Sequence, residues 1–173
     1  MTNTSILEKL YDHAFDMVKF GETKNTVLIA FNLAFIAGLT RLAFSFFNWY
    51  IFLYLMFAIA MCAISLFIAA SALVARTKNT PPEQPLPVSD KPLFFATVAN
   101  MTQEQLLDKL NNQYHSSAEN PQYESDLARQ AIITSQIASK KFKLFNTAIA
   151  FTFGGVATPV GLLIYRLFFY TKK

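Results

Sequence analysis

The segment from Ile51 to Ala75 contains no charged residue, and most of its positions are apolar. A helix needs about 20 such residues to cross the hydrocarbon core of a bilayer. Charged residues make up 15% of the whole chain and hydrophobic ones 53%, whereas a soluble domain usually carries about a quarter charged residues. One hydrophobic core cannot bury all of these apolar side chains, so some of them must contact lipid. The pattern therefore predicts a transmembrane helix over residues 51–75.

Two further segments have the length and apolar character of a membrane span. The first covers residues 26–47 and is followed by Trp49 and Tyr50, aromatic residues of the kind that collect at a membrane–water interface. The other covers residues 144–168. We therefore predict an all-α integral membrane protein with about three transmembrane helices.

The remaining segments are polar and predict helices outside the bilayer. Apolar residues recur every three or four positions in residues 1–25, which indicates an amphipathic helix packed on another polar helix. Residues 76–143 predict a helical sensor region that begins with a proline-rich linker at 80–92. From about Tyr123 the helical pattern runs into the third span without a breaker. Two pairs have the spacing of a capping box: Ser5 with Glu8, and Thr102 with Gln105.

The distribution of lysine and arginine predicts the orientation. Cytoplasmic loops carry an excess of these residues, and here most of them lie in the N-terminal and central segments. No signal peptide precedes the first span, so we expect the N-terminus and the central region to be cytoplasmic. Three basic residues oppose this orientation, because they lie at the opposite end of the third span: Arg166, Lys172 and Lys173.

Four residues in the predicted spans are unusual for lipid contact. Asn32 is expected to bond a neighbouring helix, and Gly154 with Gly155 would allow helices to approach closely. Arg41 either extends its charge to the interface or has a paired or pore-lining role. From Asn32 and the two glycines we predict a homo-oligomer.

No catalytic or metal-binding pattern stands out, so we expect neither an enzyme nor a resident cofactor. A basic face with interleaved aromatics is also missing, which argues against nucleic-acid binding. The polar residues near the membrane are compatible with a small-anion site, in which cationic groups bind a phosphate and aromatic rings contact a base. The alternative is lipid-headgroup contact with salt bridges between helices. The candidate ligand residues are Glu22, Lys24, Phe94, Phe95, Arg129 and Gln130, while Lys140 and Lys141 are predicted headgroup anchors.

Three short motifs occur in a characteristic order. They are Gly21-Glu22-Thr23-Lys24 followed by Asn32, then Leu93-Phe94-Phe95, then Leu127-Ala128-Arg129-Gln130 followed by Lys140-Lys141-Phe142. In this order and spacing, the chain resembles the transmembrane effectors of the bacterial Pycsar antiphage system. Ala96 stands where that resemblance leads us to expect glycine.

The resemblance implies a function that composition does not. It implies a multi-pass protein of the bacterial inner membrane, activated by cyclic CMP or cyclic UMP from a pyrimidine nucleotide cyclase. On activation it would impair the membrane and cause abortive infection. The competing hypothesis is a structural or accessory subunit of a membrane complex, with the central region as a docking module. Only an effector should become toxic with the nucleotide alone.

Overall fold

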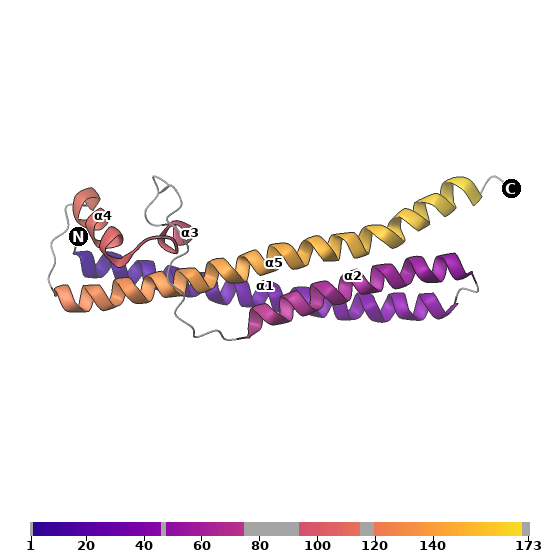
Figure 1. Cartoon of the computed structure of the whole chain (residues 1–173), viewed down its shortest axis with the longest axis horizontal. Coiled ribbons are helices and arrows are strands. Elements are labelled where there is room, and N and C mark those ends of the chain that lie inside the picture. Colours follow the sequence, from indigo (N-terminus) through magenta and orange to yellow (C-terminus); the bar gives the residue numbers. More distant parts are fainter. Residues whose placement is uncertain (1, 46–47, 75–93, 115–119, 171–173) are drawn as a thin grey trace. The chain divides into compact units, whose positions relative to one another are not determined.

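The computed structural model describes residues 2–45, 48–74, 94–114 and 120–170, with the backbone alone at 113–114, 162–163 and 165–170. Regular structure in these residues is helical, as predicted. The helices are α1 (Asn3–Ser45), α2 (Trp49–Leu73), α3 (Phe95–Val98), α4 (Gln103–Tyr114) and α5 (Pro121–Tyr170) (Figure 1). The predicted linker at 80–92 lies outside the described residues, as do Lys172, Lys173 and the side chain of Arg166.

Two compact units divide the chain, and both long helices contribute to each of them. Residues 1–22 and 75–142 form one, called here the polar unit; residues 23–74 and 143–173 form the other, called the membrane unit. α1 and α5 each continue from one unit into the other as a single helix. The predicted uninterrupted helix into the third span is therefore confirmed. It begins at Pro121, a favourable residue for the first turn because proline lacks the N–H that this turn leaves unbonded.

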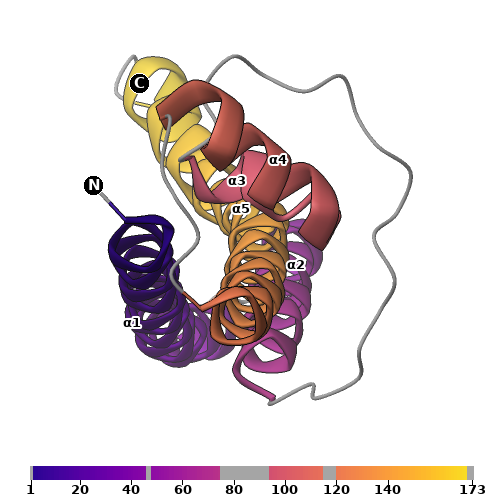
Figure 2. The same ribbon diagram turned by 90° about the vertical axis from the view of Figure 1, so that its left-hand side faces the viewer.

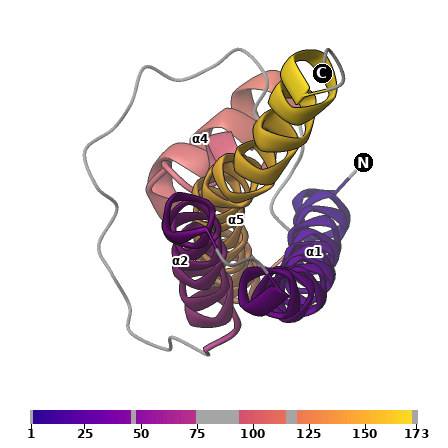
Figure 3. The ribbon, with the colours of Figure 1, turned by 90° about the vertical axis from the view of Figure 1, so that its right-hand side faces the viewer.

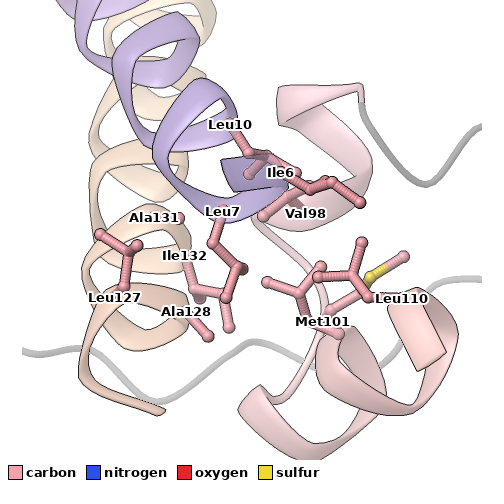
Figure 4. Close-up of a cluster of buried hydrophobic side chains, with 11 residues drawn as sticks. Ile6, Leu7, Leu10, Val98, Met101, Leu110, Leu127, Ala128, Ala131 and Ile132 are labelled. Atoms are coloured by element: carbon pink, nitrogen blue, oxygen red, sulfur yellow. The ribbon is translucent and has the colours of Figure 1, made fainter. Parts of the chain in front are cut away.

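The polar unit has a hydrophobic core shared by α1, α4, α5 and the segment around α3. Figure 2 views α1 and α5 along their axes, and Figure 4 shows the core side chains pointing toward one another. Leu7 of α1 and Leu106 and Leu110 of α4 are completely buried, and burying a leucine contributes about 1.5–3 kcal/mol. Other members of the core are Ile6, Leu10, Val98, Met101, Leu127, Ala128, Ala131 and Ile132. The amphipathic face of α1 thus packs on polar-unit helices, as predicted.

One of the two predicted capping boxes is present. Thr102 N donates to Gln105 Oε1 at 3.1 Å, and Gln105 N donates to Thr102 Oγ1 at 3.3 Å. The prediction at Ser5 is wrong, because α1 begins earlier, at Asn3. Ser5 N instead donates to Thr2 Oγ1 at 3.4 Å, so Thr2 occupies the capping position.

The membrane unit consists of the second part of α1, the whole of α2 and the second part of α5. α2 runs antiparallel to the other two segments (Figure 1), and Figure 3 views the three helices end-on. α1, α2 and α5 are each long and apolar enough to cross a membrane. Asn48 caps α2, since its Oδ1 accepts from Tyr50 N at 3.0 Å.

In the membrane unit, α2 buries mainly small side chains, and many large apolar side chains lie on the outside. Apart from Leu55, the residues of α2 that are buried are small: Ala58, Cys62, Ser65, Ala69 and Ala72. Phenylalanines lie on the outside, with Phe44 80%, Phe67 75% and Phe153 66% exposed. Large apolar side chains are as favourable in lipid as in a protein interior, so burying them gains little. Small residues lie in the interior because they let the helices contact each other closely.

Candidate functional site

An ion pair joins the two long helices of the polar unit. Lys141 Nζ of α5 lies 2.9 Å from Glu22 Oε1 of α1; the Lys141 side chain is 10% exposed and that of Glu22 49%. Gly21 favours this approach, because a Cβ at Gly21 would lie in tight contact with Lys141 Cβ, at 3.3 Å. The structure therefore places Lys141 against α1, whereas its position in the sequence predicts contact with lipid headgroups.

A chain of four aromatic rings lies in the same unit. The Phe20 and Phe142 ring centroids are 6.2 Å apart, those of Phe142 and Phe95 5.7 Å, and those of Phe95 and Phe94 4.9 Å. The rings at the two ends are the accessible ones, with Phe20 49% and Phe94 52% exposed. Phe20 and Phe142 are the immediate sequence neighbours of Gly21 and Lys141, so α1 and α5 contact each other through rings and charges in consecutive positions. We call the four rings with Glu22 and Lys141 the aromatic–ionic cluster.

The cluster unites parts of three motifs that are far apart in the sequence. Glu22, Phe94 and Phe95 were predicted as ligand residues and are members of it. Arg129 and Gln130 are not: both are exposed on α5, and Arg129 precedes Lys141 by about 18 Å along the helix axis. The grouping of Arg129 with Phe94 and Phe95 that the sequence suggested is not the one that the structure forms.

Lys141 was missed as a cluster residue, although a signal for its position exists. Ala131, Ser135 and Ala138 are buried on α5 at spacings of three and four, and Lys141 is the next position of this stripe. Continuing the period of buried positions would have placed Lys141 inward. Lys140 is exposed, and its role as a headgroup anchor stays a prediction.

Lys24, another predicted ligand residue, belongs to the membrane unit. Its Nζ lies 5.4 Å from the centre of the Phe145 ring, a geometry in which the ring face attracts the charge. Lys24 thus contacts α5 near the start of that unit's α5 segment.

The membrane unit contains a buried polar layer to which each of its three helices contributes one side chain. Asn32 Nδ2 donates to Ser65 Oγ and to Thr152 Oγ1, both at 3.1 Å, and Ser65 and Thr152 lie 2.7 Å apart through their hydroxyl oxygens. Ser65 Oγ also donates to Ala148 O at 2.7 Å. The expectation that Asn32 bonds a neighbouring helix is therefore correct, and the sequence pattern alone does not identify its partners Ser65 and Thr152.

The two glycines of α5 also make their contacts within one chain. A Cβ at Gly154 would lie 2.7 Å from Met61 Cε, and one at Gly155 would lie 2.5 Å from Cys62 Sγ. Both glycines thus let α5 pack closely on α2. The contacts of Asn32, Gly154 and Gly155 thus lie inside the membrane unit of one chain, so these residues no longer support the predicted homo-oligomer. The homo-oligomer stays a prediction.

Arg41 lies on the outside of the membrane unit. Its side chain is exposed, and it is four residues from Ser45, the last residue of α1. A long side chain near a helix end can extend its charge to the interface. This position favours snorkelling over pairing inside the three-helix unit.

These features define a class of protein: an all-helical membrane protein with three helices of spanning length and a separate polar helical unit. The chain matches the Pycsar effector protein domain over residues 6–168, and it belongs to this family. It is therefore an inner-membrane effector of antiviral defence that is linked to a Pycsar cyclase system. Neither a curated protein nor a solved structure matches the chain significantly.

Proposed function

We propose that this effector binds cyclic CMP or cyclic UMP in its polar unit and responds by impairing the inner membrane, so that the infected cell stops growing. The observation that supports this best is the aromatic–ionic cluster, which offers a cation, a carboxylate and accessible rings on α1, α5 and the segment around α3. Phosphate groups bind ammonium groups, and pyrimidine rings stack on aromatic side chains. The effect is on the membrane itself and needs no catalysed reaction.

The continuity of α1 and α5 supports a mechanical route from ligand to membrane. A ligand shifts an equilibrium between two packings only if it binds one of them better than the other. A nucleotide that alters how α1 meets α5 in the polar unit changes the same two helices that supply two of the three spans. The binding free energy of the nucleotide then stabilises a different packing of the helices in the bilayer.

Cells that produce the chain should lose membrane potential only when a pyrimidine nucleotide cyclase is active in them. The measurement is a potential-sensitive dye, read with an active cyclase and with a catalytically dead one. An accessory subunit of a membrane complex would give no response to the nucleotide without its partner proteins. An unchanged potential with measured nucleotide present would therefore contradict the effector mechanism.

We further propose that the N-terminus and the polar unit face the cytoplasm. Lysine and arginine in residues 1–25 and 76–143 support this orientation. An alkaline phosphatase fusion after Pro87 should be inactive, because this enzyme folds only outside the cytoplasm, and a fusion after Asn48 should be active. The reverse pattern of activity would show that the orientation is inverted.

A further inference from the structure

The two partners of the Glu22–Lys141 ion pair differ in their access to water. The Lys141 side chain is 10% exposed, whereas that of Glu22 is 49% exposed. A carboxylate that is half solvated can turn into water at little cost, because water replaces the lost partner. Water cannot solvate an ammonium as buried as that of Lys141 in this way, so removing its anion is unfavourable. Lys141 therefore favours an anion at this position, but not necessarily that of Glu22.

A phosphodiester is a suitable substitute for this carboxylate. Each carries one negative charge at neutral pH and offers oxygen acceptors to an ammonium group. Exchange of one for the other keeps Lys141 paired and leaves the charge at the site unchanged. We propose that Lys141 binds a phosphodiester monoanion in exchange for Glu22, so that Glu22 occupies the ligand's position in the resting state; that the ligand is a cyclic nucleotide rests on the proposed function.

The position of the pair gives this exchange a consequence. Glu22 is the last residue that α1 contributes to the polar unit, and Lys141 is the last but one that α5 contributes. Glu22 is bound across the interhelix contact at Gly21, where there is no side chain on α1 to hold the helices apart. Releasing Glu22 therefore removes a bond between α1 and α5 where both leave the polar unit. Ligand binding and helix separation become coupled through one lysine.

Two substitutions test the exchange because they should act in opposite directions. The full-length protein is purified in a phospholipid-free detergent, and binding of cyclic CMP and cyclic UMP is measured by calorimetry. Lys141→Met should weaken binding at least tenfold, roughly the effect of losing a charged hydrogen bond. Glu22→Gln should strengthen binding about two- to fivefold, because the ligand no longer displaces a carboxylate. If Glu22 instead contacted the ligand, Glu22→Gln would weaken binding, and the exchange would be refuted.

Lys140→Met is the matched control, since Lys140 is the exposed neighbour of Lys141. It removes the same charge at an exposed position and should leave nucleotide affinity within about twofold, because an exposed cation contributes little. Unchanged affinity in Lys141→Met, or equal losses in both variants, would refute the assignment. Should Lys141→Met fail to fold, Glu22→Gln still decides by the sign of its effect.

A lipid headgroup such as that of phosphatidylglycerol presents the same phosphodiester chemistry. The second arm of the experiment therefore titrates phosphatidylglycerol into the detergent and follows thermal unfolding of the wild type and of the Lys141→Met and Glu22→Gln variants. If the wild type binds neither nucleotide but is stabilised by this lipid through Lys141, the exchange holds with lipid as its source, and the nucleotide function fails. If Lys141→Met responds to both ligands as the wild type does, the exchange itself is wrong.

Discussion

Gly155→Ala should destabilise the membrane unit, although alanine is the better helix former. The added Cβ would lie 2.5 Å from Cys62 Sγ and 3.1 Å from the backbone oxygen of Ala58. The sulfur can turn away, but the carbonyl oxygen cannot move without shifting α2. Overpacking of this kind costs about 1–3 kcal/mol, which exceeds the roughly 0.5–1 kcal/mol that alanine gains over glycine inside a helix. The melting temperature of the protein in mild detergent should fall.

Gly38→Ala is the control for this prediction. Gly38 also lies in a span, on α1, but a Cβ there would have nothing within 4 Å. This variant should be as stable as the wild type or slightly more stable, since only the helix preference changes. Cys62→Ala removes the nearer clash and should restore part of the stability of Gly155→Ala. A destabilisation of the same size at Gly38 and Gly155 would mean that close packing against α2 is not the cause.

Asn32→Leu should be a second strongly destabilising substitution, with its effect inside the monomer. The buried amide bonds two other helices, because its Nδ2 donates to Ser65 Oγ and to Thr152 Oγ1, both at 3.1 Å. Bonds of this kind average about 0.6 kcal/mol each in membrane proteins, so the loss of both costs about 1 kcal/mol, and burying two hydroxyls that have lost this partner adds to the cost. The melting temperature should fall by the same amount at every protein concentration.

A pair of threonines separates the polar layer from a general effect of lost hydroxyls. Thr152 and Thr40 both donate to the carbonyl oxygen four residues earlier, that of Ala148 and that of Ile36 respectively. Thr152 also contacts Asn32 and Ser65 on other helices. Thr152→Val should therefore cost about 1 kcal/mol, whereas Thr40→Val should change stability by less than about 0.5 kcal/mol. Equal effects would show that bonds between the helices contribute nothing measurable.

The helices could largely be predicted from the sequence because local pattern decides them. An uncharged apolar segment as long as residues 51–75 has no stable state in water, and an α-helix bonds all its backbone groups within lipid. The box at Thr102 and the unbroken pattern after Tyr123 are also local, since they involve residues three or four positions apart. The box predicted at Ser5 failed because Thr2 offers the same cap closer to the chain end. Sequence rules of this kind do not decide which of two nearby capping residues begins a helix.

The partners of the polar side chains could not be predicted in the same way. Arg129 and Lys141 are both cations on α5, and charge alone does not tell them apart. Their difference comes from α1, where Gly21 leaves room for Lys141 and Glu22 supplies its counter-ion. The separation in sequence between Glu22 and Lys141 is 119 residues, so no local spacing relates them.

What the sequence by itself determined is which segments are helical and which of them have the length and polarity of a membrane span. Hydrophobic period and helix caps act within a few residues, and solvation by lipid depends on composition. Only the tertiary structure decided that Asn32 joins Ser65 and Thr152 inside one chain, and that Lys141 faces Glu22 and not the solvent. A hydrogen bond or ion pair depends on distances of about 3 Å, and only the packing of one helix on another sets distances of that size between remote residues.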